Sequence, residues 1–194
     1  MAKRAVFLDR DGALNIEKGY MHQVEDLELI PGVAQSVRRL NDAGLFCCLV
    51  SNQAGPARGY YPLAHVEALN ARLVKLLAAE GNAHLDAMHY CPYLSPAEGA
   101  VNPEFAIWGT WRKPNTGMLV AAAWKYDLDI RRSFMIGDKA TDVDLAHNAG
   151  AKGILVQTGY GQAVLSGDHQ HATQPDYTAE DLNDGVEWIL EQLE

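Results

Sequence analysis

The sequence predicts an α/β fold, a three-layer sandwich built on a central parallel, Rossmann-like sheet. Two observations predict it. Short apolar runs recur along the 194-residue chain, and amphipathic stretches of helical periodicity separate them. Strands that alternate with helices are typical of a doubly wound parallel sheet. With 48% hydrophobic residues, we expect one domain over residues 1–194 and no large cap domain.

The expected strands are short apolar segments bounded by turn or charged residues. The first, Ala5 to Leu8, has four consecutive apolar residues, as in a strand buried on both faces. The others are expected at residues 45–50, 85–91, 133–136 and 153–156, with a short edge strand at 176–178.

The expected helices follow apolar spacings of three and four residues. One begins after Pro31-Gly32 and ends before Gly44, and a second covers residues 63–80. Three more are expected at 118–126, 141–149 and 180–193. The segments in between are read as loops: 14–29 as a flap, 54–62, 92–111, and a glycine-rich turn at 158–162.

Composition limits the possible partners and compartment. The net charge of −9 argues against nucleic-acid and membrane-surface partners, which favour basic proteins. Three cysteines form no disulfide framework, which indicates a reducing cytoplasm. The first apolar run is too short for a signal peptide, and no run reaches membrane-spanning length. We expect a cytoplasmic monomer that acts on a small phosphorylated metabolite.

Two carboxylates, Asp9 and Asp11, follow the first strand directly, and Gly12 comes next. In open α/β sheets ligands bind at the carboxyl ends of the strands, so both acids are candidates for chemistry. A capped tight turn at Asp11-Gly12 explains this stretch equally well when it is considered alone.

Other strands end in polar residues as well, and this decides between the two interpretations. Ser51 and Asn52 follow the second strand, Arg112 and Lys113 lie beyond the third, and Asp138 follows the fourth. A parallel sheet brings these groups to one edge. Carboxylates from two loops make an oxygen-rich site that suits Mg²⁺, while a serine and a lysine suit a phosphoryl group.

In this order, the motifs Asp9-x-Asp11-Gly12, Ser51, Lys113 and Gly137-Asp138 with Asp142 resemble those of the haloacid dehalogenase superfamily of phosphatases. More narrowly, the sequence is similar to the heptose bisphosphate and histidinol-phosphate phosphatases. The segments that carry this likeness are Asp9-Arg10-Asp11-Gly12, Ser51-Asn52-Gln53, Ala57-Arg58-Gly59, Arg112-Lys113-Pro114 and Gly137-Asp138-Lys139.

The resemblance implies a role for each residue. Asp9 would be the nucleophile and Asp11 the general acid and base. Mg²⁺ would be held by Asp9, the backbone carbonyl of Asp11, and Asp138. Ser51, Asn52 and Lys113 would bind the transferring phosphoryl, and Arg58 and Arg112 would contact substrate or phosphate. Lys139 and Asp142 would support the metal site from behind.

A heptose bisphosphate is the first expected substrate. Histidinol phosphate or another small metabolite is the alternative, and a non-catalytic phosphate-binding protein is a third possibility. Selection among substrates is expected to depend on the loops at 14–29, 55–61 and 92–111.

The sequence departs from the heptose phosphatases at their structural zinc site. The positions of the four ligands correspond to Cys91, Tyr93, Gly109 and Trp111, so only Cys91 remains and we expect no zinc. We expect Tyr93, Trp108 and Trp111 to pack together in its place. Ala13 replaces a threonine and removes no catalytic group. His169 and His171 are expected to be solvated residues of a polar loop.

Overall fold

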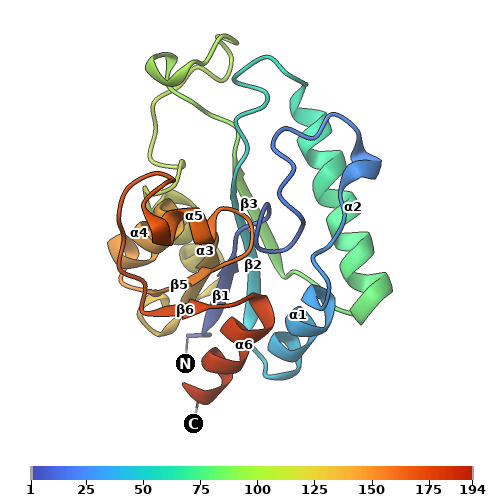
Figure 1. The fold of residues 1–194 in the computed structure, drawn as a ribbon, viewed down its shortest axis with the longest axis vertical. Helices are drawn as coiled ribbons and strands as arrows, with labels where there is room; N and C mark the ends of the chain where they lie inside the picture. Colours follow the sequence, from blue (N-terminus) through green and yellow to red (C-terminus); the bar gives the residue numbers. More distant parts are fainter. Residues whose placement is uncertain (1, 194) are drawn as a thin grey trace.

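The computed structural model describes residues 2–193 and contains one parallel sheet of six strands, in the order β3-β2-β1-β4-β5-β6 (Figure 1). This confirms the predicted α/β sandwich. The strands are β1 (Ala5–Leu8), β2 (Phe46–Asn52), β3 (Ala87–Cys91), β4 (Phe134–Gly137), β5 (Lys152–Val156) and β6 (Tyr177–Ala179).

Six helices flank this sheet in two layers (Figure 1). Helices α1, α2 and α6 cover one face, while α3 and α4 cover the other, with the short α5 beside α4. Their bounds are α1 (Val33–Asp42), α2 (Leu63–Gly81), α3 (Gly117–Tyr126), α4 (Ala140–Ala149), α5 (Gly161–Ser166) and α6 (Leu182–Glu191).

The central strand β1 shows how the chain fills both layers of the core. Val6 and Leu8 lie in the core beneath α1 and α6, whereas Ala5 and Phe7 lie in the core beneath α3. All four are fully buried, because successive side chains of a strand point to opposite faces and helices cover both. An unbroken apolar run is therefore what this position requires.

The sequence did not predict α5. A glycine-rich turn was expected at 158–162, but the chain begins a helix at Gly161 that ends at Ser166. Six residues give less than two turns, too few for a recognisable period. Val164 is the buried anchor of this helix and packs against Ala140, Val143 and Leu155. The other expected elements agree with the structure to within about two residues at each end, the usual uncertainty of such boundaries.

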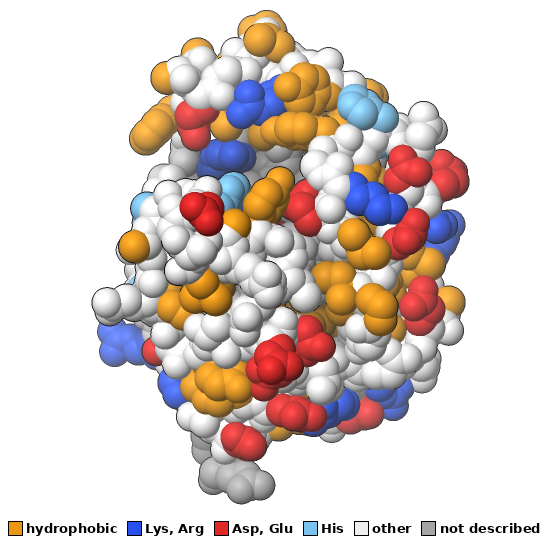
Figure 2. All heavy atoms as spheres, viewed as in Figure 1, with side chains coloured by type: hydrophobic (Ala, Val, Ile, Leu, Met, Phe, Trp, Pro, Cys, Tyr) orange, Lys and Arg blue, Asp and Glu red, His pale blue; other side chains and the backbone are white. Residues whose placement is uncertain are grey.

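The loops that follow the strands gather at one side of the sheet. The flap at 14–29 lies beside α2, and the loop at 92–111 projects furthest from the sheet (Figure 1). In the space-filling view, basic side chains border a hollow beneath these uppermost loops (Figure 2). Among the described residues, no helix has the length and apolar character needed to cross a membrane.

Candidate active site

The carboxyl ends of β1, β2 and β4 form the floor of a pocket of about 450 Å³. Asp9 follows β1, Ser51 lies near the end of β2, and Lys113 enters from the loop before α3. All three are at least 95% buried yet line this pocket. The parallel topology thus brings together side chains that lie far apart in the sequence.

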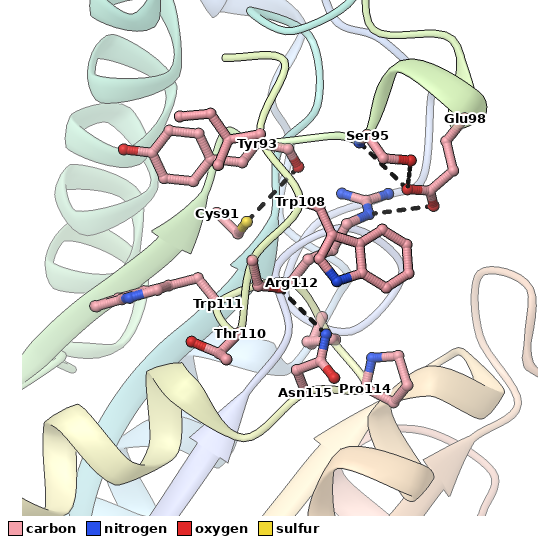
Figure 3. Close-up of a pocket in the computed structure, with 13 residues that line it drawn as sticks. Cys91, Tyr93, Ser95, Glu98, Trp108, Thr110, Trp111, Arg112, Pro114 and Asn115 are labelled. Carbon is pink, nitrogen blue, oxygen red and sulfur yellow. Dashed lines mark hydrogen bonds and ion pairs between the residues drawn. The ribbon is translucent and has the colours of Figure 1, made fainter. Parts of the chain in front are cut away.

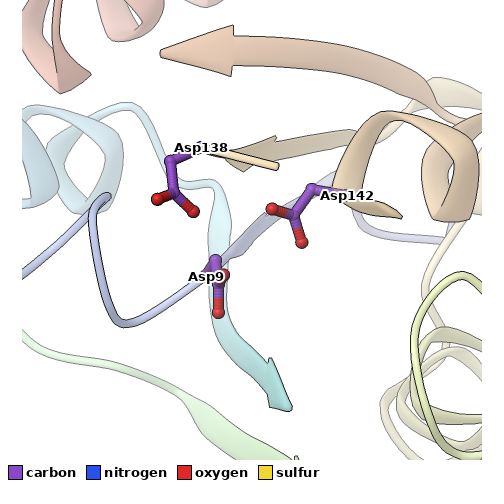
Figure 4. Close-up of side chains that lie close together, drawn as sticks. All are labelled: Asp9, Asp138 and Asp142. Carbon is purple, nitrogen blue, oxygen red and sulfur yellow. The ribbon is translucent and has the colours of Figure 1, made fainter. Parts of the chain in front are cut away.

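Three aspartates lie close together beneath the pocket, as Figure 4 shows for Asp9, Asp138 and Asp142. One carboxylate oxygen from each falls within 4.8 Å of the others. Among the described residues, this is the only group of three or more ligating side chains close enough to share a metal ion. Asp138 and Asp142 are fully buried, so their mutual repulsion is poorly screened by water.

Lys113 neutralises part of this charge. Its Nζ lies 2.8 Å from Asp9 Oδ1 and 2.6 Å from Asp142 Oδ1, and it donates to the carbonyl of Val50 at 3.1 Å. Burial would lower the pKa of Lys113, but Asp142 and Asp9 raise it above its usual value. Lys113 is therefore a fixed cation beside the candidate nucleophile.

Asp138 has the properties expected of a residue that binds a cation. Burial, together with Asp9 and Asp142, raises its pKa to about 7, although Lys139 opposes the shift. Its Oδ2 accepts from the Tyr160 backbone N–H at 2.9 Å, while its Oδ1 has no hydrogen-bond partner and lies 3.3 Å from Lys139 Nζ. Lys113 offsets the charge of only part of this cluster through Oδ1 of Asp142 and of Asp9, so the carboxylates of Asp9 and Asp138 still fit a hard divalent cation such as Mg²⁺.

Two glycines allow the backbone to approach Asp138. Gly12 and Gly159 both have positive φ, at 81° and 56°. A Cβ at either position would collide with the Asp138 carboxylate. The turn after β1 and the turn after β5 meet here, because Thr158 Oγ1 donates to the Gly12 carbonyl at 2.5 Å. Glycine is therefore required by both the turn geometry and the space around the acid.

Asp11 lies beside Asp9 but has different partners. It accepts hydrogen bonds from Arg10 at 2.9 Å, Asn15 at 3.0 Å and Gln53 at 2.8 Å. Burial would raise the pKa of Asp11, but Arg10 and these hydrogen bonds hold it below its usual value. The carboxylate is thus ionised and oriented, as a general base requires.

Arg10 and Gln53 were not predicted as site residues. Arg10 is only 2% exposed and also donates to Gln53 and Asn70. A charged residue after a strand reads as solvated from sequence alone, because arginine is seldom buried unless it is paired. Its position between Asp9 and Asp11 was the available signal.

Ser51 and Asn52, the residues expected to contact a phosphoryl group, both line the pocket. Ser51 Oγ accepts from Gln53 Nε2 at 2.9 Å, which leaves its own proton free to donate into the pocket. Asn52 exchanges two hydrogen bonds with the backbone of Lys113, at 3.0 and 3.2 Å. Asn52 therefore positions Lys113 in addition to lining the pocket.

Asp142 belongs to the carboxylate cluster itself, and Lys139 lines the pocket beside it. Asp142 was expected to support the metal or to pair with Lys139. In the structure the Asp142 carboxylate pairs with the ammonium of Lys113. It also accepts a hydrogen bond from the Lys139 backbone N–H at 3.0 Å. The Lys139 ammonium lies 3.3 Å from both Asp138 and Glu17. Glu17, from the flap, was not predicted and ties that loop to the site.

The loop at 92–111 differs from the prediction. Tyr93, Trp108 and Trp111 do not pack together. The ring centroid of Tyr93 lies 6.1 Å from that of Phe105, and the ring centroid of Trp111 lies 5.8 Å from that of His89. The Trp108 side chain is 81% exposed. Figure 3 shows these side chains around a cavity of about 270 Å³. A small core of Leu94 and Phe105 against Ala54 and Ala57 anchors the loop instead. Cys91 Sγ contacts the Tyr93 carbonyl at 3.7 Å.

The two arginines lie at different depths. Arg112 lines the pocket, whereas Arg58 lies behind it, with its guanidinium close to Gly99. Only Arg112 is thus placed to touch a ligand directly.

The expectation that His169 is solvated is wrong. It lines the active-site pocket and stacks on Tyr160, with ring centroids 4.3 Å apart. The polar composition of its loop gave no sign that α5 returns this segment to the pocket. His171 is 56% exposed and pairs with Asp144 at 2.5 Å, which agrees with the surface position expected for it.

Comparisons with known proteins agree with this geometry. The Hydrolase_like family model, for HAD-hydrolase-like proteins, matches residues 110–185. The D-glycero-D-manno-heptose-1,7-bisphosphate 7-phosphatase of Thermosynechococcus vestitus is 67% identical over 193 residues, which covers 100% of this chain and 98% of that protein. The D-glycero-beta-D-manno-heptose-1,7-bisphosphate 7-phosphatase of Escherichia coli is 39% identical over 157 residues, covering 80% of each.

A solved structure gives the same result. The crystal structure of D,D-heptose 1.7-bisphosphate phosphatase from B. bronchiseptica, complexed with magnesium and phosphate, has a TM-score of 0.83 and 29% identity, and covers 97% of this chain and 99% of that one. Fold, site and relatives lead to one conclusion: this chain is a phosphatase and belongs to the heptose bisphosphate phosphatase family of the haloacid dehalogenase-like hydrolases.

Proposed function

We propose that this phosphatase is Mg²⁺-dependent and removes the 7-phosphate of D-glycero-D-manno-heptose 1,7-bisphosphate through an aspartyl-phosphate on Asp9. The observation that carries this proposal is the contact of Asp9 with Lys113, at 2.8 Å on the pocket floor. It provides a carboxylate nucleophile with a fixed cation beside the point of attack. The names of the relatives with 67% and 39% identity supply the substrate.

In the first half-reaction, an Asp9 oxygen attacks phosphorus while the bond from phosphorus to the leaving oxygen breaks. Asp11 gives its proton to the leaving alkoxide. In the second, Asp11 takes a proton from water as that water attacks phosphorus, which frees phosphate and restores the Asp9 carboxylate. Two moderate steps replace one displacement that is very slow without a catalyst.

Asp11 must hold a proton before it can act as an acid. Its pairing with Arg10 favours the ionised form, which is ready for the second half-reaction. Protonation therefore has to compete with Arg10, and the acid step is the more demanding one for an alkoxide leaving group.

Asp9 and Asp138, with the backbone carbonyl of Asp11, would hold Mg²⁺. The ion would offset the charge of the carboxylates and of the phosphoryl oxygens when bound. Ser51 and Lys113 would bind the transferring phosphoryl, with Asn52 holding Lys113 in place. Lys139 and Asp142 would fix the surrounding charges.

Arg112 would contact the second phosphate of the substrate at the outer part of the pocket, with Arg58 adding positive charge behind it. This favours a bisphosphate over histidinol phosphate, whose distal end is cationic. We further propose that the protein is a cytoplasmic, monomeric single domain. Its three cysteines are buried free thiols, as a reducing compartment permits.

The test is a panel of phosphorylated metabolites ranked by kcat/KM, with and without Mg²⁺. It includes the heptose bisphosphate, histidinol phosphate and p-nitrophenyl phosphate. We expect the heptose bisphosphate to rank first and phosphate release to require Mg²⁺. A higher kcat/KM for histidinol phosphate would overturn the substrate assignment, and full activity in a metal chelator would overturn the cofactor.

A further inference from the structure

Glu98 is an acidic residue near the part of the pocket where the proposed substrate carries its distal phosphate. It lines both the active-site pocket and the neighbouring cavity of about 270 Å³, so it lies on the boundary between them. Figure 3 shows its carboxylate reaching toward Arg112 on one side and Ser95 on the other. No step of the proposed mechanism uses it.

Local structure holds this carboxylate in place. Glu98 ends the short 3₁₀ helix Pro96–Glu98, and its Oε2 accepts from Ser95 Oγ at 2.7 Å and from Ser95 N at 3.3 Å. The bond from the Ser95 backbone N–H is one half of a capping box, whose other half is the Ser95 side chain accepting from the Glu98 backbone N–H. The Ser95 hydroxyl, with Arg112 and Arg58 nearby, holds the pKa of Glu98 below its usual value. The side chain is therefore a tethered anion near neutral pH.

Glu98 faces the two arginines that the proposed function assigns to the distal phosphate. Its Oε1 lies 3.9 Å from Arg112 Nε, too far for a hydrogen bond but close enough for attraction. Arg58 lies against Gly99, the next residue along the chain. Arg58 Nε and Arg112 Nη1 are both buried without a hydrogen-bond partner. Arg112, which lines the pocket, thus retains capacity for a better anion.

We propose that Glu98 is a specificity-determining residue that competes with the distal phosphate of the ligand for Arg112. This inference rests on the proposed function. A bisphosphate replaces the weak Glu98 contact with a phosphate contact. After the first phosphate is removed, the product still carries its distal phosphate, and Glu98 competes with it again. Glu98 therefore weakens binding of the substrate and speeds release of the product.

The expected magnitude is moderate. Glu98 is about half exposed, and exposed charge pairs typically contribute less than about 1 kcal/mol. Removing the charge should therefore change the affinity for a distal phosphate by about three- to fivefold, since 1.4 kcal/mol corresponds to tenfold.

The test compares Glu98→Gln with wild type, using the heptose bisphosphate and p-nitrophenyl phosphate, which has no distal phosphate. Glutamine keeps an oxygen that can accept from Ser95, so the loop should retain its shape. We expect the ratio of kcat/KM for the bisphosphate to that for p-nitrophenyl phosphate to rise about three- to fivefold. The inhibition constant of the heptose 1-phosphate product should fall by a similar factor.

Two matched variants separate this effect from a general loss of charge. Glu104→Gln removes an exposed acid from the same loop, and we expect it to leave the ratio unchanged. In an Arg112→Gln background, the effect of Glu98→Gln should largely disappear, because the two residues act on one contact.

An unchanged or lowered ratio in Glu98→Gln, with wild type active on the bisphosphate, would overturn this inference and leave the proposed function standing. If wild type hydrolyses p-nitrophenyl phosphate but not the bisphosphate, the proposed substrate fails and the inference fails with it.

Discussion

At the scale of single residues, the site is a balance of buried charges. Three carboxylates, Asp9, Asp138 and Asp142, face the ammonium groups of Lys113 and Lys139. One negative charge is left over in a place where water screens poorly, and Glu17, which also contacts Lys139, adds a second. A divalent cation offsets this charge and prepares the site for a phosphoryl dianion. Asp138 Oδ1 shows this excess of negative charge most clearly, because it is buried and accepts no hydrogen bond.

Asp138→Asn tests this balance through stability. The pKa of Asp138 in the fold, about 7, lies above its usual value of 3.8, so the native state binds more protons and the metal-free protein loses stability as pH rises between these values. The asparagine variant lacks this loss. We expect its free energy of unfolding, measured without metal, to exceed that of wild type by an amount that grows between pH 5 and pH 8.

Mg²⁺ provides the control for that experiment. It should raise the melting temperature of wild type and have a much smaller effect on Asp138→Asn. An equal Mg²⁺ shift in both proteins would show that Asp138 is not a metal ligand.

Asp11→Asn tests the division of work between the two aspartates at the site. p-Nitrophenolate is a good leaving group and needs little acid assistance, whereas the water step needs a base. We therefore expect a burst of about one p-nitrophenolate per protein, followed by turnover reduced by roughly 10²–10⁴-fold. Stopped-flow absorbance measures both phases. A steady rate without a burst, at wild-type speed, would contradict the role of Asp11.

At the scale of elements, the turns that follow the strands determine which side chains can reach the site. The turns after β1 and β5 close over Asp138, and each has a positive-φ glycine at the contact. Apolar runs predicted the strands. Polar residues at the strand ends predicted Asp9, Ser51 and Asp138, and the Arg112-Lys113 segment beyond the third strand predicted Lys113. The position of His169 could not be predicted, since it depends on a six-residue helix whose sequence has no clear period.

Gly159→Ala should disrupt the turn after β5. The added methyl meets the Asp138 carboxylate, and φ is positive. We expect the Mg²⁺-induced rise in melting temperature to be lost and kcat/KM to fall at least about a hundredfold, since small displacements of reacting groups carry that cost.

Gly167→Ala, at the end of α5, is the matched control for Gly159→Ala. Its φ is also positive, but nothing lies within 4 Å of the added Cβ. It should cost about 1 kcal/mol of stability from backbone strain and keep its activity. Equal loss of activity in both variants would show that strain, not contact with Asp138, is responsible.

At the scale of the whole molecule, the sheet separates stability from chemistry. The two core clusters fill the faces of the sheet, while every candidate catalytic side chain lies at its carboxyl edge. The same arrangement explains why the cysteines are buried, since they lie within β2 and at the end of β3, between the two layers of helices. The separate packing of Tyr93 and Trp111 was not predictable, because aromatic residues in an irregular loop show no periodicity.

The three cysteines should be unreactive in the folded protein. All are buried, and burial raises the pKa of Cys47 to about 12, so the thiolate is scarce near neutral pH. We expect no fast reaction with a thiol reagent in buffer and three equivalents of reaction in denaturant. Rapid labelling of one thiol in native buffer would show that part of the core opens readily.

The most direct test of the account is phosphate release by Asp9→Asn. The variant removes the nucleophile but keeps a side chain of the same size, so circular dichroism should show an unchanged fold. With Mg²⁺ and the heptose bisphosphate, we expect turnover to fall to background and no phosphate to become covalently attached. Turnover near the wild-type rate in the folded variant would contradict nucleophilic catalysis by Asp9.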